Sequence, residues 1–315
     1  MSLRRFGVLL VAAALGIAVG MPPAFGTEVS GENGRIAFTR NPSSDPDIWS
    51  MRPNGADPVN LTADSAAADA EPSWRPDGHK LAFISNRMTV TNPEGDFEIF
   101  VMNANGARVR QLTANKLDEE FPSWSPDGRK LVFQRDFDPV EGEADYDLFT
   151  MNADGTHQRN LTRSPGIQDE NADWSPNGRR IVFSSDRDGD GEIYTMRPDG
   201  SRVRQLTVNE GPFDGGPAWS PDGGRIAFDS DRAGNPELYT MRANGSHQTR
   251  LTFNEASDFL STWSPDGRKL AFTTDRDGNF EVYTMRADGS HKVNRTQNPA
   301  ADFDPDWQPL QEEHH

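Results

Sequence analysis

Six acidic residues recur at one place in the chain, five residues before each of six tryptophans. They are Asp69, Glu119, Asp169, Asp214, Asp258 and Asp302. Carboxylates gathered by a repeat would bind a hard cation through oxygen ligands, most naturally Ca²⁺. Carboxylates can also act in acid/base chemistry, but no unequal pair stands out among these six. We call them the ring acids.

Two interpretations of the ring acids stay open. Each acid would cap the tight turn before its strand by accepting backbone N–H groups, or the set would hold a cation or a cationic ligand. Six bare carboxylates around one opening would repel by about 1 to 4 kcal/mol per adjacent pair. A cation, Arg partners, raised pKa values or solvent access must therefore compensate.

A repeating unit positions these acids. Its tryptophans lie 50, 50, 45, 44 and 44 residues apart, and most are followed by Ser-Pro-Asp-Gly or a close variant. The unit at residues 218–252 contains four short segments rich in Ile, Phe, Tyr and Thr, separated by turns with Gly, Asp or Asn. Such segments are typical of strands joined by hairpins. Four antiparallel strands per repeat of this length indicate a propeller blade.

The two ends of the repeat region predict how the ring closes. The first Phe-containing strand, residues 36–38, has no Trp strand before it, and Trp307 has no such strand after it. We therefore predict an all-β, six-bladed β-propeller with four-stranded blades. Its ring is closed by the C-terminal strand, which joins the first blade as the innermost strand, with Asn33-Gly34 in place of the missing turn.

The segments outside the repeats are short. Arg4 and Arg5 precede an apolar run at residues 6–20, and Ala24-Phe25-Gly26 offers a cleavage site. This pattern is typical of a signal peptide, and an uncleaved anchor is the alternative, for which the run is short. The predicted organisation is a signal peptide at 1–26, a short N-terminal segment at 27–32, the propeller at 33–310 and a tail at 311–315.

Composition limits the classes of partner and the cellular compartments that we expect for this chain. The net charge of −17 argues against nucleic acid, because phosphate binding needs a basic surface, and favours a protein or peptide with a basic surface. The chain has no Cys, so it forms no disulfide and carries no lipid-modified Cys. We expect a soluble periplasmic or secreted monomer without stable membrane insertion after signal cleavage.

Blades differ in their hairpin loops. The loops at residues 86–97 and 135–146 are longer than the others, and we expect them beside the ring acids, where they form either a wall of a binding site or neutral length variation.

The segment 186–192 is interpreted as a turn rather than a calcium loop. We expect its Arg187 to pair with Glu192, with the equivalent arginines in later blades pairing likewise. The position three before each Trp varies freely and is assigned no role.

The repeated Trp-Ser-Pro-Asp-Gly-(Arg/Lys)-(Ile/Leu)-(Ala/Val)-Phe, followed by Ser-Asp-Arg-Asp-Gly and Glu-Ile-Tyr-Thr-Met, resembles the six-bladed propeller of TolB, a bacterial periplasmic protein. The resemblance covers roughly residues 33–310 and implies a propeller that binds proteins and holds cations in its channel. TolB has an additional α/β domain before its propeller, which we do not expect here, so its trans-envelope role does not carry over. No Gly-x-Ser-x-Gly follows the repeats, in contrast to prolyl oligopeptidase-like enzymes.

Three classes of function follow, because the fold alone does not choose among them. The first expectation is a non-enzymatic extracytoplasmic protein-binding module or scaffold that acts through its acidic channel face. It requires no cofactor, and the central channel offers a candidate site for Ca²⁺. The alternatives are a hydrolase or lyase that acts on envelope or extracellular polysaccharide through channel carboxylates, and a carbohydrate-binding propeller with equivalent pockets between blades.

Overall fold

The structure is a computed structural model of the chain. It describes residues 33–41, 45–63, 65–137 and 145–309. The predicted signal peptide, the N-terminal segment at 27–32 and the tail at 311–315 lie outside the described residues. Within the described ranges, no helix is long and apolar enough to span a membrane.

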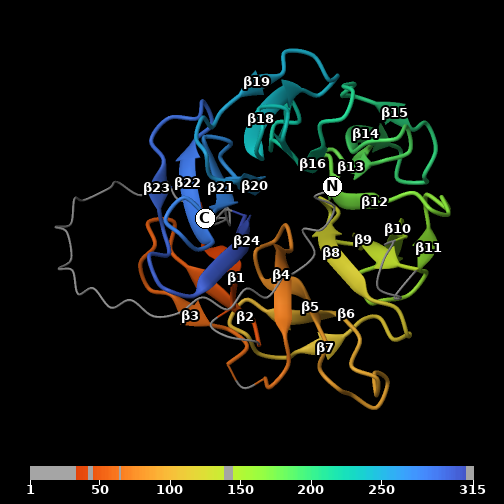
Figure 1. The fold of residues 1–315 in the computed structure, drawn as a ribbon. Helices are drawn as coiled ribbons and strands as arrows, with labels where there is room; N and C mark the ends of the chain where they lie inside the picture. Colours follow the sequence, from red (N-terminus) through yellow and green to blue (C-terminus); the bar gives the residue numbers. More distant parts are fainter. Residues whose placement is uncertain (1–32, 42–44, 64, 138–144, 310–315) are drawn as a thin grey trace, which may run out of the picture. The chain divides into compact units, whose positions relative to one another are not determined.

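Six antiparallel sheets of four strands follow one another around a ring (Figure 1). The first three blades contain β24 (Ala301–Trp307), β1 (Ile36–Asn41), β2 (Asp47–Met51) and β3 (Val59–Asn60); β4 (Asp69–Trp74), β5 (Lys80–Ser85), β6 (Glu98–Asn103) and β7 (Arg110–Gln111); and β8 (Glu119–Trp124), β9 (Lys130–Asp136), β10 (Tyr146–Asn152) and β11 (Arg159–Asn160).

The strands of blades 4 to 6 follow the same order from the channel outward. They are β12 (Asp169–Trp174), β13 (Ile181–Ser185), β14 (Glu192–Met196) and β15 (Arg204–Gln205); β16 (Asp214–Trp219), β17 (Arg225–Ser230), β18 (Glu237–Arg242) and β19 (Thr249–Arg250); and β20 (Asp258–Trp263), β21 (Lys269–Thr274), β22 (Glu281–Arg286) and β23 (Val293–Asn294). The predicted six-bladed all-β fold is confirmed.

Strand β24 closes the ring. It pairs antiparallel with β1, and Trp307 lies opposite Ile36. The Gly34 N–H donates to the Gln308 carbonyl at 3.2 Å, and the Gln308 N–H donates to the Arg35 carbonyl at 2.7 Å. The first blade thus gains its innermost strand from the C-terminal part of the propeller, as predicted.

The apolar core lies in layers between neighbouring blades. Trp174 and Phe183 of blade 4, for example, pack against Val132 and Leu148 of blade 3. At the closure, Trp307 packs with Ala271 of blade 6. Because every blade contributes to two such layers, apolar burial holds the ring together and fixes the ends of the inner strands.

The two ends of the inner strands define two faces. In blade 2, Asp69 lies opposite Ser85, from which the β5–β6 loop leaves, and Trp74 lies opposite Leu81, beside the Pro-Asp-Gly turn. The same registers recur in blades 3 to 6. We call the first end, with the ring acids and the loops between blades, the loop face. The other end, with the short Gly-containing turns, is the turn face.

Each inner strand contains a β-bulge. In blade 2 the register shifts between Ala70 and Ser73, so Glu71 and Pro72 have no opposite residue, and the other five inner strands shift at the same place. The residue three before the Trp has a positive φ in all six strands, including φ 47° at Phe121 and 48° at Leu260. A bulge bends a strand and redirects side chains, here into the channel.

Candidate functional site

The six ring acids are completely buried at the start of the inner strands, each beside an Arg of its own blade. The ion pairs have N···O distances of 2.5 to 2.7 Å and comprise Arg40–Asp302, Arg87–Asp69, Arg135–Glu119, Arg187–Asp169, Arg232–Asp214 and Arg276–Asp258. The repulsion expected among six bare carboxylates is therefore compensated within each blade.

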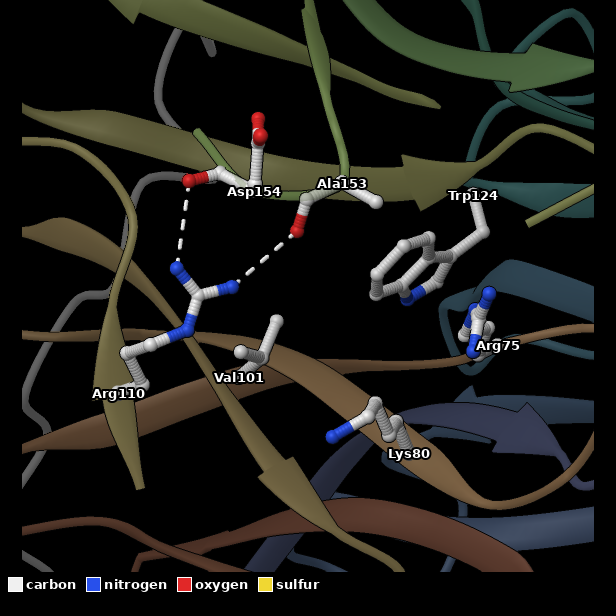
Figure 2. A pocket seen from close by; sticks show the side chains of 7 residues that line it. All are labelled: Arg75, Lys80, Val101, Arg110, Trp124, Ala153 and Asp154. Atoms are coloured by element: carbon white, nitrogen blue, oxygen red, sulfur yellow. Dashed lines mark hydrogen bonds between the residues drawn. The ribbon is translucent and has the colours of Figure 1, made fainter. Parts of the chain in front are cut away.

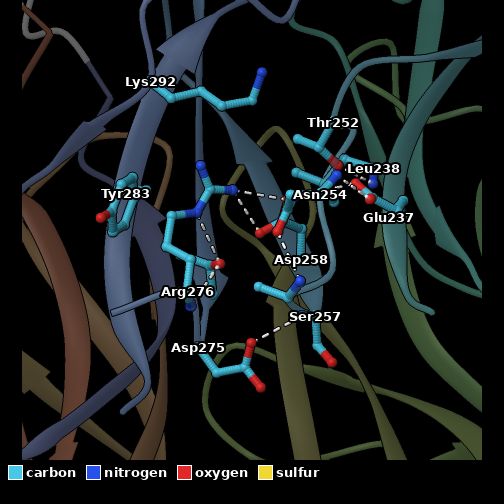
Figure 3. Close-up of polar contacts among 12 residues, drawn as sticks. Glu237, Leu238, Thr252, Asn254, Ser257, Asp258, Asp275, Arg276, Tyr283 and Lys292 are labelled. Atoms are coloured by element: carbon cyan, nitrogen blue, oxygen red, sulfur yellow. Dashed lines mark hydrogen bonds and ion pairs between the residues drawn. The ribbon is translucent and has the colours of Figure 1, made fainter. Parts of the chain in front are cut away.

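Every one of these arginines also lies over two aromatic rings. Arg276, shown in Figure 3, has its guanidinium carbon 5.5 Å from the Phe272 ring centre and 4.8 Å from that of Tyr283. The other five blades repeat the arrangement. Such contacts attract a cation to the ring face and fix the side chain in one position.

The predicted pairing of Arg187 with Glu192 is wrong. Arg187 pairs with Asp169, and its Nε donates to the Ser185 hydroxyl at 2.9 Å. Ser185 ends the second strand opposite Asp169, so the Arg that follows folds back toward the channel rather than outward. The equivalent predictions for Arg232 and Arg276 fail for the same reason.

The acids that open the third strands form a second buried set. In Figure 3 the Asn254 N–H donates to Glu237 at 2.7 Å, and the Asn254 side chain donates to Asp258 at 2.7 Å. One Asn thus links an acid of blade 5 to the ring acid of blade 6. Asn115 and Asn298 make the same two contacts at their blade boundaries. The sequence interpretation did not anticipate this link.

Burial raises the pKa of several of these carboxyl groups. It raises the pKa of Asp69, against the opposing effect of Arg87. Burial and the neighbouring Glu119 raise the pKa of Glu98 to about 9, and burial raises that of Glu192 to about 7. Burial on the loop face thus favours the protonated form of these carboxyl groups.

The ring acids do not share one ligand set. In the described part of the chain, no group of three or more His, Asp or Glu side chains is arranged to hold a metal ion. Each ring acid has its own Arg, which occupies the position that a cation would take. The calcium prediction for the ring acids stays a prediction.

The central channel is lined by the bulges instead. Residues one to three positions before each Trp surround a cavity of about 160 Å³, with contributions from all six blades. The position that varies freely in the sequence supplies its most diverse side chains, namely Glu71, Phe121, Asn171, Leu260 and Asp304, with Gly216 in blade 5. Variation inside an otherwise uniform repeat was the available signal for this lining.

Two channel oxygens lack a hydrogen-bond partner among the described residues. The Ser261 hydroxyl oxygen, on a side chain that is 5% exposed, and the Asn171 side-chain oxygen have no hydrogen-bond partner among the described residues. Burial, Glu120 and Asp304 raise the pKa of Glu71 well above its usual range, and burial raises that of Asp304 to about 7. A proton donor or a cation in the cavity would satisfy these oxygens.

Two further channel acids connect blades. Asp306 accepts the Trp74 N–H at 2.6 Å and the Thr262 hydroxyl at 3.3 Å, which joins blades 6, 1 and 2. Asp173 accepts the Ser123 hydroxyl at 3.1 Å and the Trp219 N–H at 2.8 Å. Since these carboxylates are occupied by contacts between blades, we assign them a structural role.

Comparisons with known proteins agree with this architecture. Residues 210–313 match the TolB beta propeller domain family. A 78-residue stretch, 25% of this chain, is 33% identical to a protein TolB homolog from Chlorobium luteolum, and it spans only 16% of that relative. TolB from Acinetobacter baumannii superposes with a TM-score of 0.75 at 24% identity, over 88% of this chain and 67% of that one.

An enzyme is also similar in fold. Puromycin hydrolase, in the structure of its S511A variant with PGG, superposes with a TM-score of 0.61 at 19% identity, over 84% of this chain and 45% of that one. At such identities, the likeness shows the fold alone. The sequence repeats, the closed ring of six blades and the match over residues 210–313 together show that the chain is a six-bladed β-propeller similar to that of TolB.

Proposed function

We propose that the chain is an extracytoplasmic protein-binding module whose loop face docks a partner with basic and apolar side chains. The observation that carries the proposal is the distribution of exposed large apolar side chains. Six of them lie on the loop face, and these six include the four most exposed, Met88, Val90, Val208 and Phe253, together with Phe137 and Phe213. The others are valines on or beside the outer strands, and they are less than half exposed, as are Phe137 and Phe213.

Two of these side chains stand at one repeat position. Val208 is 80% exposed and Phe253 is 71% exposed, and each follows a Thr just beyond the end of an outer strand, β15 or β19. The same position holds Ala63, Ala114, Arg163 and Gln297 in the other blades. Apolar groups surrounded by a polar rim are typical of the energetic centre of protein interfaces.

An exposed acidic residue follows each of the two apolar groups in the sequence. Glu210 and Glu255 are exposed two residues after Val208 and Phe253, and the Phe253 ring lies 4.7 Å from the Arg250 guanidinium. Negative charge around apolar anchors favours a basic partner and speeds its association. Charge and apolar surface thus support the same class of partner.

The long loop of blade 2 extends this surface. Met88 and Val90 are 76% and 100% exposed, near the exposed Glu94. The Asn92 side chain, itself completely buried, donates to the Asp96 carbonyl at 2.7 Å and accepts the Gly95 N–H at 3.1 Å. An internal network therefore holds the loop that presents the two apolar side chains. Residues 138–144 of the blade 3 loop lie outside the described residues.

The test compares the two faces with matched double variants. The full chain would carry V208S/F253S on the loop face or V59S/V203S on the outer strands, and purified protein would be crosslinked to its partners in an extract of its own organism. We expect a basic protein to be captured by the wild type and by V59S/V203S. V208S/F253S and 1 M salt should each abolish the capture.

Capture by all three proteins, or by none, would contradict the proposal. The enzyme alternative would instead be supported if the chain degrades a polysaccharide and channel substitutions such as Asp304→Asn abolish that degradation. Fractionation of the same cells tests the extracytoplasmic placement, which rests on the sequence.

A cation in the channel is the second candidate, and the unsatisfied oxygens of Ser261 and Asn171 favour it. Oxygen ligands beside Glu71 and Asp304 suit Ca²⁺. Excess Ca²⁺ should raise the Tm relative to chelator, because a ligand that binds only the folded state stabilises it. D304N should reduce this rise, and D258N should leave it unchanged if the ring acids take no part. No Ca²⁺ dependence in the wild type would remove this candidate.

A further inference from the structure

A second pocket lies on the turn face, between blades 2 and 3. Its volume is about 200 Å³, and its polar lining consists of Arg75, Lys80 and Arg110, with the Asp154 turn at its edge. Val101 and Trp124, which are 4% and 6% exposed, supply apolar surface (Figure 2). Three cationic side chains in one small pocket are unexpected in a chain whose net charge is −17.

Two departures from the repeat meet at this pocket. Arg75 occupies the position that Ser125, Ser175, Ser220 and Ser264 hold after the tryptophans of blades 3 to 6. Val101, which pairs with Arg110, occupies the position where the other third strands have hydroxyl side chains. Those side chains are Ser50, Thr150, Thr195, Thr240 and Thr284. One change adds a positive charge and the other removes a hydroxyl group.

Arg75 reaches across the blade boundary. In the other blades, the Ser hydroxyl accepts a backbone N–H of its own turn, as Ser220 does from Arg225 at 2.9 Å. Arg75 instead donates through Nε to the Gly128 carbonyl at 3.1 Å, and its guanidinium lies 5.7 Å from the Trp124 ring centre. A Cβ at Gly128 would come within 2.8 Å of Arg75 Nε, so this glycine leaves room for the Arg.

The other two cations are held by neutral oxygens. Arg110 donates to the carbonyls of Asp154 at 3.2 Å and Ala153 at 3.3 Å, and Figure 2 shows the Asp154 carboxylate turned away from it. Lys80 donates to the Asn103 side-chain oxygen at 3.3 Å. Neutral oxygens thus accept the hydrogen bonds of Arg110 and Lys80, whereas Arg75 forms an ion pair with Asp77.

Trp124 and Val101 offer the pocket apolar contact only. The Trp124 indole N–H donates to the Ser73 carbonyl at 3.2 Å, so the indole presents its carbon surface to the pocket. Val101 adds methyl groups. A ligand group of matching chemistry has an anionic end for the cations and a small apolar or planar body for the indole. The volume limits the group to about the size of one side chain, below that of drug-sized sites.

We propose that this pocket is a binding site for a carboxylate carried on a small apolar or aromatic body. The site lies on the face opposite the proposed docking surface, so it is independent of that function. The carboxylate belongs either to a free small acid or to the C-terminal residue of a polypeptide, which share this chemistry.

The test uses the full chain labelled with ¹⁵N at tryptophan, with the Trp124 indole signal assigned from a W124F sample. Benzoate is the probe, and benzamide, which has the same shape without the charge, is its neutral control. We expect a saturable shift of the Trp124 signal with benzoate and none with benzamide. Arg75→Ser should weaken benzoate binding about tenfold or more, and Val101→Thr should weaken it less.

Both substitutions restore the residue that other blades carry at that place, so each variant should keep the wild-type Tm and fold. Arg204→Ala, which removes the blade 4 counterpart of Arg110, is the matched control and should leave benzoate affinity unchanged. The proposal is overturned if benzoate gives no saturable shift. It is also overturned if benzamide binds equally well, or if R75S binds benzoate like the wild type.

A second arm identifies the source of the carboxylate. N-acetylphenylalanine resembles a polypeptide C-terminus, and its amide lacks the charge. Tighter binding of N-acetylphenylalanine than of benzoate, lost in the amide, would assign the site to a chain end. Tighter binding of benzoate would assign it to a free small acid.

Discussion

Carboxyl groups on the turn face accept hydrogen bonds from their own turns, whereas the ring acids and the acids that open the third strands are buried on the loop face. The Ser220 hydroxyl and the Gly224 N–H lower the pKa of Asp222, and hydrogen bonds from Ser201 lower that of Asp199. On the loop face, burial raises the pKa of Glu98 and Glu192. The turn face thus uses acids as local caps, and the loop face uses them to join elements.

This difference separates scaffold from candidate function. Where all blades carry the same residues, as in the ring acids with their arginines, the contacts are internal and hold the ring. Where blades differ, as at Val208, Phe253 and Arg75, the side chains reach the surface or a pocket. A departure from the repeat is therefore a better guide to binding than the repeat itself.

Breaking one ion pair on each face should give the largest difference in stability loss between the two faces. Arg232→Met leaves Asp214 buried without its counterion, and we expect a loss of about 3 kcal/mol in the free energy of unfolding, measured in urea. Arg52→Met on the turn face removes a pair whose side chains are 63% and 59% exposed, and the loss should stay below about 1 kcal/mol. Equal losses would refute the distinction, and R232M/D214N should recover much of the first loss.

Glycine positions provide the next contrast. Gly200 on the turn face has φ +81°, and a Cβ there would lie 2.4 Å from the Leu161 carbonyl oxygen of the neighbouring blade. Gly166 on the loop face has φ +73° with open space around it. Both Ala variants carry backbone strain of about 1 kcal/mol, and G200A should lose about 1 to 3 kcal/mol more through the clash. Urea unfolding that ranks G166A as the worse variant would contradict this.

The dependence of Tm on pH should separate the two kinds of carboxyl group. A carboxyl group with a raised pKa, such as Glu192, stabilises the fold at pH values below its ordinary pKa. This stabilisation is lost as the pH rises through the raised pKa of about 7. A carboxyl group with a lowered pKa, such as Asp222, stabilises the fold at pH values above its ordinary pKa. This stabilisation is lost as the pH falls through the lowered pKa. Tm should therefore peak in mildly acidic solution.

The matched variants for this profile are E192Q and D222N. E192Q should reduce the fall of Tm between pH 5 and 8, and D222N should reduce the fall below about pH 4. A Tm that rises steadily from pH 5 to 8 would show that the buried carboxyl groups are already ionised in the folded state.

Single side-chain truncations should show the smallest contrast. Ser220 is 3% exposed and joins Asp222 to the Arg225 N–H, so S220A should lose about 1 kcal/mol of unfolding free energy. Phe253 is mostly exposed, so F253S should change stability by less than about 0.5 kcal/mol while it weakens partner binding. A large stability loss in F253S would assign that ring to the fold instead of to docking.

The sequence predicts most of the fold and only part of the site. Trp spacing and turn residues suffice for six blades and for the closure, because strand and turn chemistry is local. The partner of Arg187 depends on the register that places Ser185 opposite Asp169 on the neighbouring strand. Glu192 is nearer to Arg187 in the sequence, but nearness in sequence does not show which acid the folded chain places beside it. The channel lining depends on bulges at residues such as Glu71 that have no sequence signature beyond variability.

The pairing of β24 with β1 has a consequence for synthesis. A ribosome makes β1, β2 and β3 first, but the inner strand of their sheet is made last, after all of blades 2 to 6. Until residues 301–307 emerge, β1 has an unpaired edge that can pair with another chain. A stalled or truncated nascent chain would therefore expose this edge, and the final strand must arrive before a second nascent chain reaches it.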